Sequence, residues 1–450
     1  MSYIFREHLI KSEISPIIAA LRSIEVNNEN SYQKNVLDNG LRVLTIPMPT
    51  SRSVTVMMMV GVGSRYESAS INGLSHFMEH MFFKGAETYP DAMAVASAID
   101  AVGGSFNAFT GEEKVAYFVK LSMSKKQIAY DVLSDMILKS KFDQEEIDRE
   151  RGVIVEEIRM YNDDPMSRVQ MDFKLHFYGD QPVGWDIAGP EKVIHSLTRD
   201  DFLDYRSLHY ASGNCVLVTA GAITHDENLQ LAEKFFTFTQ TGDKIKADPF
   251  VQKTSVRSSH NKKDIEQAHF VLGFPIPGDS HADQPALKVL TNILGGTMSS
   301  RLFYQIRERR GLAYYIRASR QSFTDAGSLQ VSAGINVDKL EEAITCVMEE
   351  IRKMQEKGIT PEELERGKEN IKGSFDLSIE NPMAVASYHA SYETLYGKVK
   401  TPEEFVAEID SVTLEMVNTA AASYLDPAKV KMTTLGPYES VDPFDKCLDS

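Results

Sequence analysis

Cysteines and long apolar runs are scarce in this chain of 450 residues. The three cysteines, Cys215, Cys346 and Cys447, are too far apart for a zinc-knuckle spacing or for the disulfide framework of a small secreted protein. No stretch approaches the roughly 18 apolar residues of a membrane span, and residues 1–30 lack the apolar core of a secretory signal. These features predict a soluble, cytoplasmic protein that has no membrane partner.

Positive charge is also in short supply. The chain has 48 Lys and Arg against 64 Asp and Glu, which gives a net charge of -16. Such a chain repels a phosphate backbone, so the charge excludes nucleic acid as an expected partner. Acidic residues also interrupt the first 30 residues, whereas a mitochondrial transit peptide is poor in acids, so a mitochondrial location is the weaker alternative.

The order of the predicted elements occurs twice along the chain. Each copy has apolar strands, a helix, a Gly-Gly pair (103–104 and 295–296), a strand pair and two long helices, which indicates an internal duplication. A chain of this length also exceeds what one hydrophobic core usually supports. We therefore predict four segments: a leader over 1–31, a catalytic zinc-binding domain over 32–238, a linker over 239–253 and a second homologous domain over 254–450.

The local patterns in the first copy predict a sheet covered by helices. Asn39-Gly40 is typical of a hairpin turn within 36–47, and 53–62 is an apolar strand. Apolar residues three and four apart predict a helix over 74–83. Strands in runs followed by paired helices favour an α+β fold, in which each domain has a mainly antiparallel sheet packed against helices.

The helix over 74–83 carries the first candidate site, a His-x-x-Glu-His motif. Residues four apart lie one above the other on a helix, so His76 and His80 can present two ring nitrogens to one metal ion. Glu79 projects near the same side and can act as a base on metal-bound water. A chance match, or two histidines satisfied by hydrogen bonds on a helix surface, is the competing interpretation.

A catalytic zinc site needs a third protein ligand and an open fourth position. The helix predicted over 144–161 offers Glu150 and Glu157, which are two helical turns apart and therefore share one face. One of these carboxylates could bind the metal while the other supports it. Imidazole and carboxylate ligands favour zinc but also accept manganese or cobalt.

These residues resemble the pitrilysin/insulinase family of zinc metallopeptidases, whose inverted His-x-x-Glu-His motif is followed by 76 residues and then a glutamate. In this sequence 76 residues separate His80 from Glu157. The resemblance covers nearly the whole chain after the leader and is to the short branch that includes processing peptidases. It implies that His76, His80 and Glu157 bind one Zn2+ per chain, that Glu79 is the general base and that Glu150 supports the site.

Residues 103–118 resemble the substrate-binding edge strand of that family. The resemblance implies that Asn107, Ala108 and Phe109 pair with an extended peptide substrate. Unpaired backbone groups on an edge strand give such pairing a physical basis. An ordinary hairpin is the competing interpretation of these residues.

In the second copy, residues 295–316 resemble the family segment that carries an arginine and a tyrosine seven residues apart. These fall on Arg307 and Tyr314, which the resemblance implies would contact substrate and stabilise the developing oxyanion. The neighbouring Arg309 and Arg310 illustrate the alternative, in which all of these are solvated surface charges.

The resemblance implies an endopeptidase that cleaves peptides or unfolded segments inside an enclosed chamber. Family members of this length form assemblies of two chains, and a chain that carries both residue sets predicts a homodimer. The rival interpretation is a noncatalytic scaffold or core subunit of the same fold. Such chains usually lose the metal-binding residues, which this sequence retains.

Overall fold

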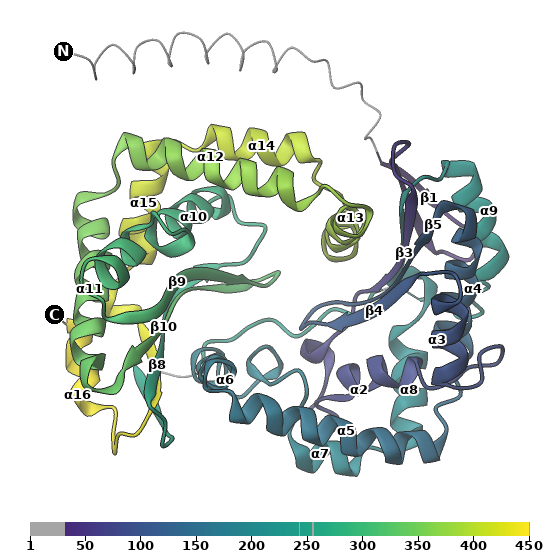
Figure 1. The fold of residues 1–450 in the computed structure, drawn as a ribbon, viewed down its shortest axis with the longest axis horizontal. Coiled ribbons are helices and arrows are strands. Elements are labelled where there is room, and N and C mark those ends of the chain that lie inside the picture. Colours follow the sequence, from purple (N-terminus) through teal and green to yellow (C-terminus); the bar gives the residue numbers. More distant parts are fainter. Residues whose placement is uncertain (1–31, 243, 254–255, 450) are drawn as a thin grey trace, which may run out of the picture.

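The computed structural model describes residues 32–242, 244–253 and 256–449. The leader predicted over 1–31 therefore lies outside the described residues. Figure 1 shows two sheets, one from each half of the chain, with helices on their outer sides. Across the described ranges, no helix is both long enough and apolar enough to cross a bilayer.

The first half of the chain forms a six-stranded sheet. Its strands are β1 (Gln33–Val36), β2 (Arg42–Pro47), β3 (Ser53–Val60), β4 (Ser105–Thr110), β5 (Val115–Ser122) and β6 (Cys215–Gly221). They are arranged in the order β1-β2-β6-β3-β5-β4, so β4 is an edge strand. The predicted hairpin is confirmed, because β1 and β2 pair antiparallel around Gly40, whose φ of 88° suits glycine.

The second half repeats this arrangement with five strands. They are β7 (Ser258–Lys262), β8 (Gln267–Pro277), β9 (Ala313–Ser322), β10 (Ala326–Asn336) and β11 (Lys431–Gly436). The order is β7-β11-β8-β10-β9, and in each sheet one parallel pair, β2 with β6 or β7 with β11, accompanies antiparallel neighbours. The predicted α+β fold with two similar, mainly antiparallel sheets is confirmed.

Helices connect the strands in both halves. The first half contains α2 (Leu74–Phe82), α3 (Ala92–Asp100), α4 (Lys126–Lys139), α5 (Gln144–Asp163), α6 (Pro165–Tyr178), α7 (Glu191–Ser196), α8 (Arg199–His209) and α9 (His225–Phe235). The second contains α10 (Gln284–Thr291), α11 (Leu340–Lys357), α12 (Pro361–Ser378), α13 (Pro382–Tyr396), α14 (Pro402–Ser411), α15 (Leu414–Tyr424) and α16 (Asp442–Asp445).

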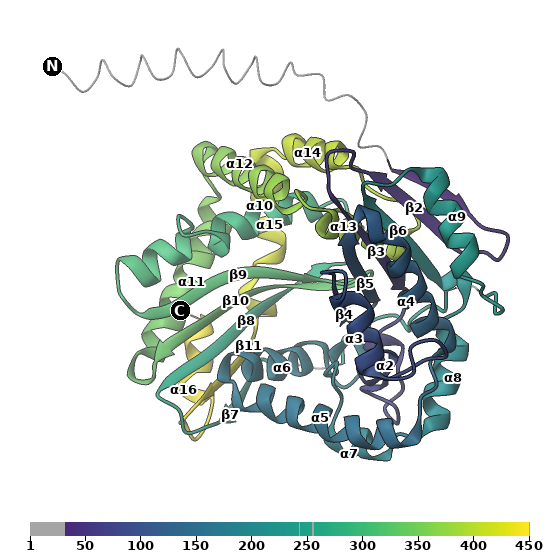
Figure 2. The same cartoon turned by 45° about the vertical axis from the view of Figure 1, so that its right-hand side comes forward.

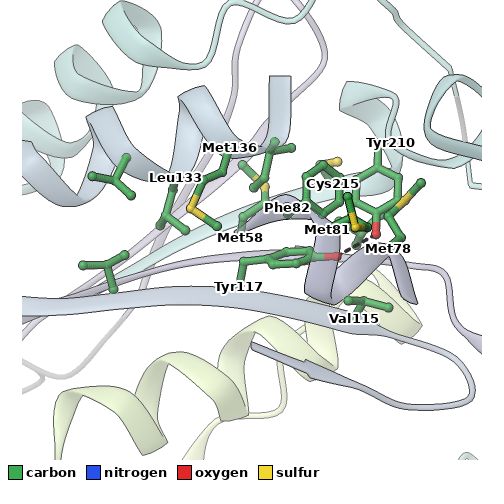
Figure 3. Packing of buried hydrophobic residues seen from close by; sticks show 14 of the residues in the cluster. Met58, Met78, Met81, Phe82, Val115, Tyr117, Leu133, Met136, Tyr210 and Cys215 are labelled. Atoms are coloured by element: carbon green, nitrogen blue, oxygen red, sulfur yellow. Dashed lines mark hydrogen bonds between the residues drawn. The ribbon is translucent and has the colours of Figure 1, made fainter. Parts of the chain in front are cut away.

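The core of the first half lies between its sheet and the helices α2, α4 and α8. Figure 3 shows Phe82 of α2 packed among Met58, Tyr117 and Tyr210, all of which are buried. The hydroxyl groups of Tyr117 and Tyr210 share a hydrogen bond of 2.9 Å, so these buried phenols are satisfied. The packing fixes α2 rigidly against the sheet.

One helix from each half packs on the sheet of the other half. The helix α6 contacts β8 and β11, whereas α13 contacts β3 and β6 (Figures 1 and 2). Ala386 and Ala390 of α13 are buried with Met57 of β3, and Phe173 of α6 is buried with Val271 of β8. This exchange of helices joins the two halves through apolar contacts.

A buried ionic group adds a polar connection between the halves. Arg65 donates to Glu113 at 2.8 Å within the first half and to Asp325 at 2.6 Å in the second. Glu113 also accepts a hydrogen bond from the Thr324 amide at 3.1 Å. Because both acids engage the same guanidinium, the charge of Arg65 is compensated although its side chain is only 3% exposed.

Candidate metal centre

The helix α2 presents one face to the core and another to the candidate site. Its residues Leu74, Phe77, Met78 and Met81 are buried in the core of the first half. The remaining side carries the histidine pair, whose ring centroids are 4.7 Å apart. The apolar periodicity that predicts this helix therefore also fixes the direction in which the polar residues project.

A buried carboxylate holds the start of α2. Glu67 accepts hydrogen bonds from the backbone amides of Gly73 at 2.8 Å and Ser75 at 2.6 Å, and from the Asn72 side chain at 2.9 Å. Burial raises the pKa of Glu67, and these hydrogen bonds oppose the rise. The arrangement satisfies amides that the helix itself leaves without a partner. The sequence analysis did not select Glu67, because a glutamate seven residues before a helix matches no capping pattern.

Two helices bring three potential metal ligands together. His76 and His80 come from α2 and Glu157 from α5, and their ligand atoms all lie within 4.8 Å of one another. Glu157 Oε2 is 3.7 Å from His76 Nε2 and 3.6 Å from His80 Nε2. These separations are too long for hydrogen bonds but close to the about 3.3 Å expected between two ligands of a tetrahedral zinc ion. The donor set and its spacing fit zinc.

The second carboxylate of α5, Glu150, orients one of the histidines. A hydrogen bond of 2.9 Å joins His80 Nδ1 to Glu150 Oε1, and Lys84 approaches the other oxygen at 2.5 Å. Burial opposes ionisation of Glu150, but the hydrogen bonds and charges of His80 and Lys84 outweigh it and lower its pKa. An ionised carboxylate only accepts, so Nδ1 carries the hydrogen and Nε2 keeps a free lone pair.

The environment of His76 favours a neutral ring. Burial and the neighbouring His80 lower the pKa of His76 to about 4. Its buried Nδ1 atom has no hydrogen-bond partner among the described residues. A neutral imidazole is the form that binds metal, so this buried ring is suited to ligation through Nε2.

Glu79 lies beside the cluster but contributes no ligand atom to it. Its Oε2 accepts a hydrogen bond of 2.5 Å from the hydroxyl of Thr110, at the end of the edge strand β4. Burial raises the pKa of Glu79, while the Thr110 hydrogen bond pulls it back. Neither Thr110 nor Lys84 belongs to the predicted site. Both are found only from the packing of β4 and α5 against α2.

The predicted substrate strand is at the edge of the first sheet. The strand β4 pairs only with β5 and contacts α2, so it lies next to the histidine helix. Asn107, Ala108 and Phe109 all belong to it, and Asn107 Oδ1 accepts a hydrogen bond of 2.9 Å from the Ala108 amide. The roles predicted for these three residues stay predictions.

The predicted arginine and tyrosine belong to the second half. Arg307 lies in a wide-turn helical segment, Phe303–Glu308, with its guanidinium 4.9 Å from the Phe303 ring. Tyr314 lies on the edge strand β9 and is 74% exposed. No ion pair joins Arg307 to Glu79 or to Glu157 within this chain.

The corresponding helix of the second half is apolar where α2 is polar. Counted from the helix start, Ala286, Val289 and Leu290 of α10 occupy the places of His76, Glu79 and His80. Among the residues that the structure describes, the α2–α5 cluster is the single group of three such ligands. The two halves share a fold but not the site.

Comparisons with known proteins agree with this division. Residues 42–191 match the family described as Insulinase (Peptidase family M16), and residues 196–371 match the Peptidase M16 inactive domain. The chain therefore contains two domains of M16 type. The predicted boundary at 239–253 stays a prediction, because the family matches do not test it.

Relatives and solved structures extend the likeness to most of the chain. An uncharacterized zinc protease of Bacillus subtilis is 37% identical, over 85% of this chain and 93% of its own length. Another from Mycobacterium leprae is 35% identical, over 90% of this chain and 92% of its own. A protease from Helicobacter pylori has the same fold, with a TM-score of 0.83 and 22% identity over 90% of this chain and 99% of that one. The chain belongs to the M16 (pitrilysin/insulinase) peptidase family.

Proposed function

We propose that this protein is a zinc-dependent endopeptidase that cleaves peptides or unfolded segments. The observation that carries the proposal is the meeting of His76, His80 and Glu157 with Glu79 beside them. The first three would hold one zinc ion per chain. When bound, zinc would supply Lewis acidity and lower the pKa of water toward about 7.

The residues of the chain divide the remaining tasks. Glu79 would take a proton from the attacking water and give it to the leaving amine, and burial in its pocket raises its pKa toward the range useful for both steps. Thr110 holds the carboxylate in place through its hydrogen bond. Glu150 acts on His80, whose tautomer and orientation it fixes.

An extended peptide would add to the free edge of β4. The side of β4 away from β5 has no strand partner in the described sheet, so Asn107, Ala108 and Phe109 can offer backbone groups to a substrate strand. The contact of β4 with α2 would bring that peptide past Glu79.

We further propose a cytoplasmic homodimer that encloses the substrate in a chamber. In this assembly the metal centre of one protomer would face Arg307 and Tyr314 of its partner, where the two side chains stabilise the oxyanion. Chains carrying Glu79→Gln and Arg307→Ala would then complement each other, because one site of the mixed dimer retains both residues. A stable, active monomer in light scattering would defeat this arrangement.

A noncatalytic scaffold is the second candidate. A structural neighbour from Pseudomonas fluorescens, with a TM-score of 0.85 and 18% identity over 91% of this chain and 98% of that one, is described as a peptidase M16 inactive domain. In contrast to the apolar α10, the helix α2 of this chain keeps the full polar set, which supports catalysis over the scaffold.

Two measurements on one set of variants test the proposal. Mass spectrometry of a peptide mixture should show chelator-sensitive cleavage by the wild type and none by Glu79→Gln, whereas metal analysis should find zinc in both. His80→Ala should lose zinc as well as activity. Glu156→Gln, one residue from Glu157 but exposed, is the control and should resemble the wild type. Zinc-loaded wild type that yields no products would favour the scaffold.

A further inference from the structure

A cavity of about 870 Å³ lies in the second half, away from the residues of the metal centre. It is formed by the loop before α10, the start of α10, the end of α13 and the helix α14, which are close together in Figures 1 and 2. A volume of this size is typical of small-molecule sites. Aromatic and charged side chains line it, including Tyr392, Tyr396 and Lys288.

Lys288 extends into this cavity from α10 without an anionic partner. Its ammonium lies 4.7 Å from the centre of the Phe405 ring, and no described residue accepts a hydrogen bond from it or forms an ion pair with it. Burial, together with the positive charge of Arg320, lowers the pKa of Lys288 to about 8. The side chain is therefore still charged at neutral pH, at a cost that a bound anion would offset.

Arg320 is the second cation in this position. It reaches from β9 to Gln284, a cavity-lining residue whose side-chain oxygen accepts its hydrogen bond. No carboxylate of the described residues lies within ion-pairing distance of its guanidinium. Burial lowers the pKa of Arg320 to about 10.

The carboxylates around the cavity are already engaged by other groups. Asp279 accepts a hydrogen bond of 2.8 Å from the Tyr396 hydroxyl, and Glu408 pairs with Lys400 at 2.6 Å. Glu404 accepts from the backbone amide of Thr401 at 2.9 Å and caps α14. The cavity wall thus contains satisfied acids beside two cations without acidic partners.

The first half contains a counterpart that lacks this imbalance. A cavity of about 430 Å³ lies against the loop before α2, the helix α6 and the start of α7. Its arginine, Arg168, pairs with Asp172 at 2.5 Å and also donates to Asn162 at 2.7 Å. The fifth residue of α2 is the buried Met78, whereas the fifth residue of α10 is Lys288. The unpaired charge is therefore specific to the second half and not a requirement of the fold.

We propose that the second-half cavity binds a small molecule bearing an oxyanion, a carboxylate or a phosphate, which pairs with Lys288 and Arg320. Tyr392 would contact the organic part of the ligand. The two cations explain why an anion is favoured, and the aromatic wall explains why a ligand with an apolar or aromatic body fits better than a bare ion. This inference does not depend on the proposed peptidase activity.

Thermal unfolding of the zinc-loaded protein with phenyl phosphate or benzoate tests the proposal, with sodium chloride holding the ionic strength constant. We expect at least one of these probes to raise the Tm of the wild type saturably by about 2–4 °C. Lys288→Met, which installs the residue found at the matching place in α2, should abolish the shift. Lys339→Met, which removes an exposed charge of the same half, should keep it.

The outcomes separate the two ligand chemistries from a general salt effect. A response to phenyl phosphate alone identifies a phosphate ligand, and a response to benzoate alone a carboxylate. Lys288→Met keeps the metal centre, so a shift caused by anion binding to zinc would survive in that variant and would overturn the proposal. So would the absence of a saturable shift with both probes. Lys288→Gln provides a second neutral variant in case Lys288→Met does not fold.

Discussion

At the scale of single residues, the metal centre depends on partners that are not ligands themselves. Glu150 is buried between His80 and Lys84 and holds the imidazole in the tautomer that leaves Nε2 free. A glutamine at this position could still accept from Nδ1 but would lose the negative charge that strengthens the ligand. The role of Glu150 can therefore be measured separately from zinc ligation itself.

We expect Glu150→Gln to weaken zinc binding by about 10 to 100-fold without eliminating it. Competition with a chromogenic chelator measures the change. Glu145→Gln removes the same charge from an exposed position on α5 and should leave affinity unchanged. Equal affinities for the wild type and Glu150→Gln would show that the hydrogen bond to His80 does not support the site.

His209 makes stability depend on pH. The ring is buried against Tyr205, with centroids 4.3 Å apart, its Nδ1 lacks a partner among the described residues, and burial lowers its pKa to about 4. Because the unfolded chain binds this proton near pH 6.5 and the folded chain does not, stability falls as the pH drops from about 6.5 to about 4. The contribution to the free energy of unfolding is about 3 kcal/mol.

We expect His209→Phe to flatten this part of the pH profile of stability. Urea unfolding at a series of pH values between 7 and 4.5 measures it, because the midpoint of the wild type should fall more steeply than that of the variant. His195, which is exposed at the end of α7, provides the control His195→Phe. Parallel pH profiles for the wild type and His209→Phe would contradict the assignment.

At the scale of elements, the sequence predicts what depends on local periodicity. The helix predicted over 74–83 is α2, Leu74–Phe82, because its apolar residues face one core. The helix predicted over 284–294 is only partly correct. The α-helical part ends at Thr291, and a wide turn follows to Gly296, because Gly295 adopts non-helical angles against Ala318 of β9.

Other features are set by contacts between distant residues and leave no local signal. The side on which α6 and α13 pack is an example, since each has an apolar face that would suit either sheet. Thr110 is another, because only the pairing of β4 beside α2 brings it to Glu79. The candidate ligands are predictable because helix geometry and one long spacing relate them, whereas their supporting residues are not.

The helix α2 offers a prediction at this scale. Glu67→Ala would leave the amides of Gly73 and Ser75 buried without acceptors, which should destabilise the first half by about 3 kcal/mol. We also expect weaker zinc binding, because the histidines project from this helix. Glu67→Gln keeps one acceptor oxygen and should have a smaller effect. Urea unfolding and chelator competition measure the two effects, and an unchanged urea midpoint for Glu67→Ala would contradict this view of the helix start.

At the scale of the whole molecule, the net charge of -16 bears on substrate choice. An acidic chamber would attract basic peptides and raise their kcat/KM relative to neutral peptides of matched length. The advantage should shrink several-fold as salt rises from about 0.05 to about 0.5 M, because screening shortens the range of the field. Cleavage rates that do not respond to peptide charge or to salt would remove this expectation.

The reciprocal packing of α6 and α13 has a thermodynamic consequence. Each sheet is covered on one face by a helix that the chain supplies from the other half, so neither half can bury its apolar surface alone. Duplicated domains joined by a simple tether can melt one after the other, with two separate heat-absorption peaks. Here the loss of either half uncovers the other, and calorimetry should record a single joint transition.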